Sequence, residues 1–436
     1  MSARFANTPL SLLDRSPEIA SVRLGVCDLN GVMRGKRLPI SMADKALDGI
    51  ALPMSTSLVD LWGADLTPSP YYDMGDPDGV AVPTGRLALP MPWLDPPSIL
   101  LPASMMTAQG LPSPVDPRHI LDRVVARYHA QGLTPVSAVE LEFYVFDQQG
   151  RAPGGLSDEG VLDLADLDRL EPFLAELEVR CGEIGLTTGA ALSEGGGGQV
   201  EVNLPHSPDP LEVADHAMMF RQVVRGVAHS QGLRATFMAL PKLDAPGNGQ
   251  HVHLSVLDGN GANIFDNGGA QGTQALRHAV GGVLAQMPDA ALLFAPHENS
   301  HRRLHNGFAP STVAWAYDSR FAAVRVPSGP PPARRIEHRV AGADANTYLV
   351  LAAISSAVLD GLSQKTDPPE PCSDQIEGPA LPVGWVRTRD VFAQSPAMQS
   401  LMGEAHGLYV ALRDQEMARI DAEMSELERN TLGSAL

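Results

Sequence analysis

Four short segments of the chain place charged or polar side chains at alternating positions. The first, 138–146, is rich in β-branched and aromatic residues, which is typical of a strand. Because successive side chains on a strand point to opposite faces, Glu140 and Glu142 share one face. Two neighbouring carboxylates repel each other unless a cation lies between them. The pair favours a cation site, although an ordinary surface strand can also carry such a pair at little cost.

Three later segments, 199–203, 251–255 and 335–340, repeat this alternation. A sheet built from all four would bury an apolar face and present cation-binding side chains on the other. Those side chains, together with one glutamate just before the second segment, are Glu140, Glu142, Glu194, Glu201, His251 and Glu337. Oxygen ligands with a single imidazole suit Mg²⁺ or Mn²⁺ better than zinc. Six ligands favour two ions, because one ion must also keep room for a substrate.

Length, charge and cysteine content narrow the class of protein. A chain of 436 residues is long enough for two or three domains. Its formal charge of −19 argues against a nucleic-acid partner and is compatible with cationic substrates, although a generally acidic surface explains it more simply. Three cysteines without a CxxC pair favour a reducing cytoplasm. We find no signal-peptide pattern and no run of 18 apolar residues, so no membrane partner is expected.

In their order and surroundings, the four segments resemble the catalytic strands of the glutamine synthetase family. The resemblance runs over nearly the whole chain and includes the fragments 28–36, 92–93, 236–238, 299–304 and 344–349. It implies an α+β fold in which a leader (1–17) precedes a small β-grasp N-terminal domain (18–110). The larger catalytic domain (111–436) would contain an antiparallel sheet funnel flanked by helices.

The resemblance also implies roles for individual residues. Two to three Mg²⁺ or Mn²⁺ ions would occupy each site, with the first held by Glu142, Glu194 and Glu201. The second ion, next to the phosphates of ATP, would be held by Glu140, His251 and Glu337. The nucleotide is expected against His253, Ser255, Arg320, Arg325 and Arg335. The substrates are expected against Gly247, Arg303, Phe308 and Arg339. The expected catalytic cations are Arg303, Arg320 and Arg339.

Other interpretations of these motifs stay open. Segment 297–301 matches the HExxH pattern of zinc proteases, which requires a helix. Pro296 before it and Gly307 shortly after it give poor support for a long helix, and the same residues fit the family's substrate loop. No P-loop is present, so metal ions and arginines would have to hold any nucleotide phosphates. His253 could instead be a buried, hydrogen-bonded histidine, and the arginines could be surface salt-bridge partners.

Two departures from the family bear on the second substrate. Ammonia-using members carry an aspartate in an Asp-Gly-Ser-Ser element, and the nearest stretch here, 54–60, has no acid at the matching place. They also carry a glutamate before an Ala-Pro pair, where this chain has Phe308. A small cation such as ammonium needs close negative charge to offset its desolvation. A larger amine could instead bury its alkyl part against Phe308 or Trp62.

These departures favour the γ-glutamylpolyamine and γ-glutamylamide synthetase branch of the family. The predicted activity is an ATP-dependent ligase that joins the γ-carboxylate of glutamate to an organic amine through γ-glutamyl phosphate. The alternatives are a glutamine synthetase that uses ammonia and a non-catalytic relative that acts as a sensor or structural oligomer. The resemblance further implies a cytoplasmic homo-oligomer, a dodecamer with sites between subunits, and no nucleic-acid or membrane partner.

Overall fold

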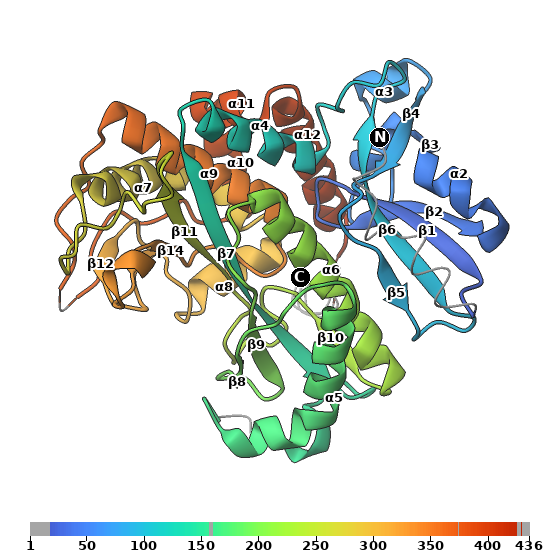
Figure 1. Ribbon diagram of the computed structural model, residues 1–436, viewed down its shortest axis with the longest axis horizontal. Helices are drawn as coiled ribbons and strands as arrows, with labels where there is room; N and C mark the ends of the chain where they lie inside the picture. Colours follow the sequence, from blue (N-terminus) through green and yellow to red (C-terminus); the bar gives the residue numbers. More distant parts are fainter. Residues whose placement is uncertain (1–17, 157–159, 374, 425–428, 430–436) are drawn as a thin grey trace.

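Two β-sheets lie side by side in the protein, each with its own helices (Figure 1). The structure is a computed structural model that describes residues 18–424, apart from 157–159 and 374, together with residue 429. The expected leader, 1–17, lies outside the described residues. The mixture of helices and sheets agrees with the predicted α+β class.

The first sheet has the strand order β2-β1-β6-β4-β3, with β5 paired to β6. Its strands are β1 (Ser21–Cys27), β2 (Met33–Pro39), β3 (Ile50–Pro53), β4 (Asp78–Pro83), β5 (Leu89–Met91) and β6 (Ser98–Met106). The turn at Asn30-Gly31 joins β1 to β2 as an antiparallel hairpin, whereas β1 and β6 run parallel. Alternate residues of β1, including Leu24, pack into a small core with α2 (Ala43–Asp48). The other short helix is α3 (Pro70–Asp73).

The second sheet has the order β12-β13-β14-β11-β7-β9-β8, with β10 paired to β7. Its strands are β7 (Thr134–Phe146), β8 (Ala191–Ser193), β9 (Gln199–Asn203), β10 (Arg234–Thr236), β11 (Gln250–Leu257), β12 (Trp315–Tyr317), β13 (Val324–Val326) and β14 (Ile336–His338). The four segments singled out from the sequence become β7, β9, β11 and β14, which are neighbours in this sheet. The pairs are antiparallel except for β12 with β13, which run parallel.

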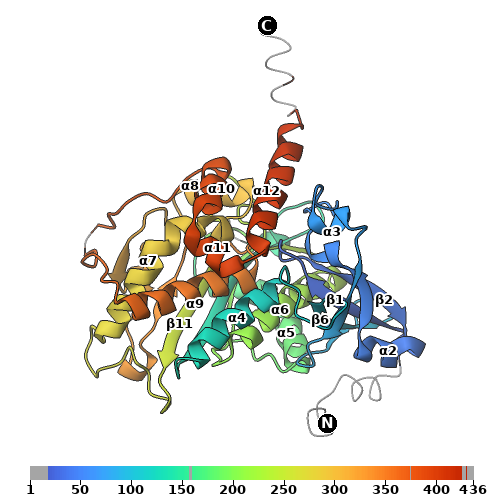
Figure 2. The ribbon, with the colours of Figure 1, turned by 90° about the horizontal axis from the view of Figure 1, so that it is seen from above.

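The helices that follow the first sheet in the chain are α4 (Pro117–His129), α5 (Leu164–Glu183), α6 (Pro210–Ser230), α7 (Gln274–Phe294), α8 (Glu298–His305), α9 (Thr347–Gln364), α10 (Trp385–Gln394), α11 (Pro396–Met402) and α12 (Ala405–Asp421). Of these, α4, α5 and α6 pack against strands of the second sheet. Short 3-10 turns occur at Ile40–Met42, Met54–Ser57, Pro153–Gly155 and Pro331–Ala333. Helix α9 packs against α4, α6 and α7 (Figure 2). The centroid of the Phe143 ring on β7 lies 6.2 Å from that of Phe173 of α5 and 6.0 Å from that of Phe220 of α6. Phe143 therefore faces these helices, and the opposite face of β7 points away from the core.

Two helices contain an internal proline, and a third forms where the sequence favoured a loop. Helix α5 runs through Pro172 without a break, and α7 runs through Pro288 to Phe294. A proline removes one backbone hydrogen bond, but the buried residues on both sides of each proline keep these helices packed. The HExxH segment is also helical, because α8 begins at Glu298 with His297 as its N-cap. It is therefore not the loop that the sequence favoured.

Helix α9 is, by length and composition, able to span a membrane. It has 18 residues and a mean hydropathy of 1.2, and 78% of it is buried inside the protein. It is the one described helix that meets this test. Its contacts with α4 and α7 give it the place of a core helix between other helices.

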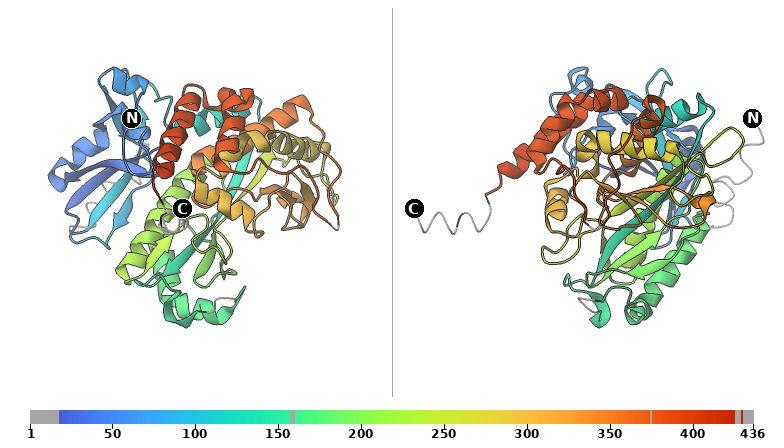
Figure 3. Two further views of the ribbon diagram at one scale, coloured as in Figure 1. Left: turned by 180° about the vertical axis from the view of Figure 1, so that it is seen from behind. Right: turned by 90° about the vertical axis from the view of Figure 1, so that its left-hand side faces the viewer.

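Helix α12 connects the first sheet to the rest of the protein (Figure 3). Arg413 and Glu416 of α12 are fully buried and form an ion pair with a separation of 3.1 Å. The Oε1 atom of Glu416 accepts hydrogen bonds from the backbone N–H of Leu61 at 3.0 Å and from Nδ2 of Asn30 at 3.1 Å. Arg413 also donates to Oδ1 of Asn30. A buried ionic network thus fixes the hairpin turn of the first sheet.

We predict that Glu416→Ala destabilises the protein by about 3–5 kcal/mol, because it leaves the buried guanidinium of Arg413 without its acid. The matched control is Asp421→Ala at the exposed end of the same helix, which should change stability by no more than about 0.5 kcal/mol. Chemical denaturation of the two variants measures the difference. Equal losses would contradict the role given to the network.

Candidate active site

Three carboxylates converge where β7, β8 and β9 meet. Glu142 on β7 lies directly opposite Glu201 on β9, and Glu194 follows β8 immediately. One oxygen from each of the three lies within 4.8 Å of the others. Burial, followed by repulsion from the neighbouring carboxylates, raises the pKa of Glu194 to about 7 and the pKa of Glu201 to about 8. Carboxylates crowded in this way gain most from a cation placed between them.

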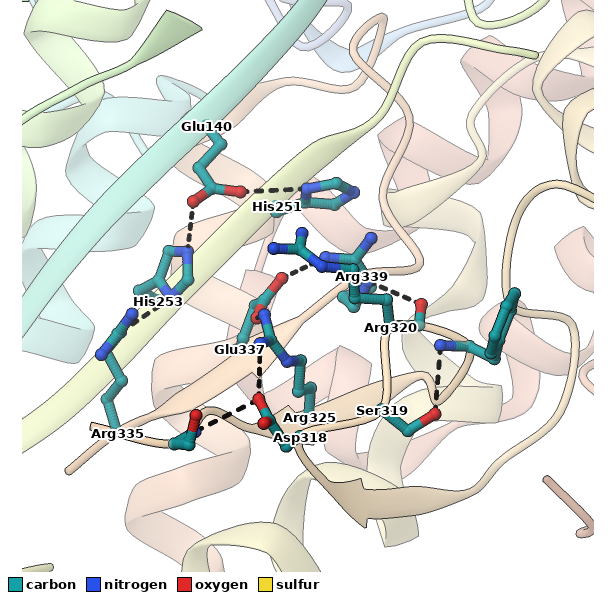
Figure 4. A network of polar contacts seen from close by, with 12 residues as sticks. Glu140, His251, His253, Asp318, Ser319, Arg320, Arg325, Arg335, Glu337 and Arg339 are labelled. Atoms are coloured by element: carbon teal, nitrogen blue, oxygen red, sulfur yellow. Dashed lines mark hydrogen bonds and ion pairs between the residues drawn. The ribbon is translucent and has the colours of Figure 1, made fainter. Parts of the chain in front are cut away.

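Glu140 connects this group to two histidines of β11. Its Oε1 lies 2.9 Å from Nε2 of His253 and its Oε2 lies 3.2 Å from Nδ1 of His251 (Figure 4). Burial works to raise the pKa of Glu140, but the hydrogen bonds and charges of the two histidines outweigh it and hold the pKa well below its usual range. Glu140 belongs to two further groups with ligand atoms within 4.8 Å, one with His251 and Glu201 and one with His253 and Glu337.

Glu337 is held by two arginines. Arg325 donates to its Oε2 at 2.9 Å, and Arg339 donates to its Oε1. Burial works to raise the pKa of Glu337, but Arg339 and the two histidines of β11 lower it below its usual value. Arg335 donates from Nε to Nδ1 of His253 at 3.0 Å. Since Nδ1 accepts this bond, the proton of neutral His253 is assigned to Nε2, which donates to Glu140.

The structure brings the predicted metal ligands into three groups that share members. The first predicted set, Glu142, Glu194 and Glu201, comes together as one group. The second predicted set is divided, because Glu140 shares one group with His251 and another with Glu337. The cause is the register of the sheet, which sets Glu140 opposite His251 and Glu337 opposite His253.

Two cavities lie on either side of these side chains. Cavity A, of about 560 Å³, has among its lining residues Glu140, His253, Ser255 and Arg335. Cavity B, of about 650 Å³, has among its lining residues Glu142, Glu194, Glu201, Gly247, His251, Arg303, Phe308, Arg320 and Arg339. Arg320, which the resemblance put beside the nucleotide, lines cavity B. Arg325 lines neither cavity, since its guanidinium is bonded to Glu337 and, at 2.7 Å, to Asp318.

Arg303 forms the deep end of cavity B. It is 4% exposed, its Nη1 donates to the carbonyl of Val340 at 2.8 Å, and its Nε has no partner among the described residues. Burial lowers the pKa of this guanidinium. A Cβ on Gly247 would lie 2.4 Å from the carbonyl oxygen of Ala239 and 2.7 Å from Cγ of Arg303, so a glycine is required there. This unpaired, buried cation suits an anionic ligand such as a carboxylate.

Two further features were not identified from the sequence. Nε2 of Gln199 lies 3.2 Å from the carbonyl oxygen of Gly247 and 3.4 Å from Oε2 of Glu142. Gln199 therefore links the backbone at Gly247 to the carboxylate of Glu142. The position of Gln199 on the polar side of the strand 199–203 was the one indication in the sequence that it belongs to the site. Trp62, the other aromatic residue considered for an amine, does not line cavity B with Phe308. Its ring lies 4.2 Å from the guanidinium of Arg419 instead.

The donor set fits divalent cations. Oxygen donors predominate in all three groups, and an imidazole is the other donor in two of them. Among the described residues, no arginine or lysine forms an ion pair with Glu142, Glu194 or Glu201. The side chain nearest to Glu142 and Glu201 that could carry a positive charge is His251, at 3.6 Å and 3.8 Å, and an imidazole is itself a ligand for Mn²⁺.

The raised pKa values of Glu194 and Glu201 predict a pH-dependent response to metal. Protonated Glu194 and Glu201 stabilise the metal-free fold at low pH. This stabilisation is lost as the pH rises through their pKa values in the folded protein, about 7 and about 8. We expect the Tm of the metal-free protein to fall from about pH 6 to about pH 8.5. Mn²⁺ should raise the Tm more at the higher pH, because the ion binds ionised carboxylates and no longer competes with protons.

Differential scanning fluorimetry with and without Mn²⁺ checks this response. At about 100 times its Kd, an ion that binds only the folded chain stabilises it by about 2.7 kcal/mol. The double variant Glu194→Gln, Glu201→Gln is the control and should lose the difference between the two pH values. An equal rise in wild-type Tm at both pH values would contradict the prediction.

Comparison with known proteins agrees with this geometry. The family model for the glutamine synthetase catalytic domain matches residues 114–432. The chain is 31% identical over 439 residues to gamma-glutamylputrescine synthetase PuuA of Escherichia coli (strain K12), covering 95% of this chain and 92% of the relative. It is 30% identical over 385 residues to gamma-glutamylethanolamide synthetase GlnA4 of Streptomyces coelicolor, covering 83% and 80%. Glutamine synthetase of Pyrococcus horikoshii is 29% identical over 413 residues, covering 91% and 89%.

Solved structures give the same result for the fold. The structure of GmaS without ligand superposes with a TM-score of 0.84 at 28% identity and covers 97% of this chain and 98% of that one. The complex of GmaS with ADP superposes with a TM-score of 0.84 at 27% identity, covering 97% and 99%. These matches confirm the resemblance drawn from the sequence, and the chain belongs to the glutamine synthetase family.

Proposed function

We propose that the protein is an ATP-dependent ligase that joins the γ-carboxylate of glutamate to an organic amine. The observation that carries this proposal is the meeting of two cavities at one group of carboxylates. Cavity A reaches Glu140 and His253 from one side, and cavity B reaches Glu142 and Glu201 from the other. A phosphoryl donor in cavity A and a carboxylate acceptor in cavity B would face each other across this group.

The nucleotide would lie in cavity A. His253, Ser255 and Arg335 line it, and the similarity to GmaS, which has been solved with ADP, supports a nucleotide ligand. Two to three Mg²⁺ or Mn²⁺ ions would be held by Glu140, Glu142, Glu194, Glu201, His251 and Glu337. When bound, the ions supply positive charge that neutralises the phosphoryl group in transfer.

The amino-acid substrate would lie in cavity B. The guanidiniums of Arg303 and Arg339 would hold its carboxylates, and the backbone at Gly247 would contact it. Arg339 is oriented by a hydrogen bond from its Nε to the carbonyl of Arg320 at 3.0 Å, and it also bonds Glu337. Arg339 and the side chain of Arg320, which lines the same cavity, would neutralise phosphate charge during transfer. Arg325 acts through Glu337 in this proposal, because its guanidinium is already bonded there.

The reaction would proceed in two steps. A γ-carboxylate oxygen of glutamate bonds to the terminal phosphorus of ATP, and the bond from that phosphorus to ADP breaks with its electron pair passing to ADP. The neutral amine nitrogen then bonds to the carbonyl carbon of the γ-acyl phosphate, and the bond from that carbon to the phosphate oxygen breaks with its electron pair passing to phosphate. The amine's surplus proton passes to solvent. The products are a γ-glutamylamide, ADP and phosphate.

The wall of cavity B supports an organic amine over ammonia. Phe308 is 65% exposed and lines this cavity at the place where the sequence lacks the family's glutamate. Similarity to synthetases named for putrescine and ethanolamine products supports the same choice. Glutamine synthetases are also among the relatives, so ammonia is the alternative to be tested. The complete set of predicted metal ligands argues against a non-catalytic sensor or structural oligomer.

We extend the proposal to the assembly. The first sheet would form a β-grasp domain within residues 18–110, and the second sheet would form the funnel of a catalytic domain within 111–436. By family resemblance the chain would be a cytoplasmic homo-oligomer, a dodecamer with sites between subunits. In such an assembly the exposed Trp62 would approach the cavity B of a neighbouring subunit, although it does not do so within one chain.

Phosphate release with ATP, Mg²⁺ and glutamate tests the activity across a panel of amines. We expect organic amines to support turnover and ammonia alone to support little, because the two acids of the ammonia-using members have no counterpart at the matching places in 54–60 and at Phe308. Glu337→Ala is the control for the site and should lower the rate by about 100-fold or more. Turnover with ammonia that matches the best amine would favour a glutamine synthetase instead.

A further inference from the structure

The mouth of cavity B is apolar on one side. Phe308 and Leu162 are each 65% exposed, Val161 is 60% exposed, and all three line this cavity. Large apolar side chains gathered at the mouth of a cavity indicate a surface that binds an apolar part of a ligand. A linear alkyl chain would fit against these three side chains.

Asp244 lies at the same mouth. It is exposed, it lines cavity B, and among the described residues no hydrogen bond or ion pair reaches its carboxylate. The carbonyl of Ala245, the next residue, accepts a hydrogen bond from Nδ2 of Asn306 at 3.1 Å. That bond joins the turn of Asp244 to the segment that carries Phe308.

The other side of the turn is also fixed. A Cβ built on Gly195 would lie 3.0 Å from Cγ of Pro246 and 3.4 Å from Cγ2 of Val161. The turn that contains Asp244 and the segment that contains Val161 therefore meet at Gly195. Asp244 thus lies on a turn that is fixed to the segments of both Val161 and Phe308.

The remaining carboxylates of cavity B have another role. Glu142, Glu194 and Glu201 form the group assigned to divalent cations, so Asp244 is the described carboxylate of this cavity that stands outside it. Arg303, assigned to glutamate, lies deep in the cavity and is 4% exposed. A free carboxylate at the rim, next to an apolar surface, suits a cation at the far end of an alkyl chain.

We propose that Asp244 binds the distal ammonium of an aliphatic diamine whose chain lies against Phe308, Leu162 and Val161. The other amino group, in its neutral form, attacks the carbonyl carbon of the acyl phosphate as described above. This inference rests on the proposed ligase activity and narrows its second substrate from organic amines to diamines. Burial of the chain should raise the apparent affinity by up to about four-fold for each methylene group placed on the apolar surface.

The test compares diamines with monoamines of equal chain length. Butane-1,4-diamine with butylamine and pentane-1,5-diamine with pentylamine are the pairs, and kcat/KM is measured for each with the full-length protein. We expect wild type to prefer the diamine of each pair. Asp244→Asn should lower the ratio of diamine to monoamine kcat/KM by about 2–5-fold, chiefly through the KM of the diamine. Asp244→Glu should retain much of the preference.

Asp168→Asn, which removes an exposed carboxylate from α5 outside cavity B, is the matched control and should leave the ratio as in wild type. An unchanged ratio in active Asp244→Asn protein would overturn the assignment of Asp244 but leave the ligase activity standing. A rise in the KM of glutamate instead would overturn it too, by assigning Asp244 to the α-ammonium of glutamate. Failure of every amine to support turnover by wild type would overturn the ligase proposal itself.

Discussion

Glu142, Glu194 and Glu201 are packed so closely that their charges repel one another, and they are partly withdrawn from water. The fold imposes this arrangement, because the register of β7 with β9 sets Glu142 directly opposite Glu201. Burial and, after it, this repulsion raise the pKa values of Glu194 and Glu201. Cations can relieve it, and the rest of the site is arranged around the place where they would bind.

The two faces of β7 explain how the fold holds these carboxylates close together despite their repulsion. On one face Leu141 and Phe143 are fully buried against the helices, and their burial fixes the strand. On the other face Glu140 and Glu142 project toward β9 and β11. Because side chains on a strand alternate, the packing of the core determines the direction of the carboxylates. The precision of the site depends on the same apolar contacts that stabilise the sheet.

Alternation along the chain was sufficient to predict the central strands of the site and the common face of their polar residues. Glu140, Glu142 and Glu201 were identified in this way, since strand period is a local property of sequence. Pairing is not local, and the division of the second predicted ligand set between His251 and His253 follows from the register of β11 with β7 and β14. The sequence alone therefore predicts the ligand residues but not the distances between them, and the assignment of ligands to individual ions stays a prediction.

Other features depend on tertiary packing in the same way. Helices α5 and α7 continue through Pro172 and Pro288 because their buried faces hold both halves, although a proline usually ends a helix. Asp244 carries no signal of its own in the sequence. Its relation to Phe308 arises from a hydrogen bond between two distant loops. The contact of Trp62 with Arg419 likewise depends on how α12 lies against the first sheet.

The number of Mn²⁺ ions bound per chain, measured by electron paramagnetic resonance, tests the central claim most directly. Glu140 belongs to two of the three ligand groups, so its neutral replacement should affect the count more than any change outside them. We expect wild type to bind at least two ions per chain and Glu140→Gln to bind fewer. An identical count in the two proteins, or no bound Mn²⁺ in wild type, would contradict it.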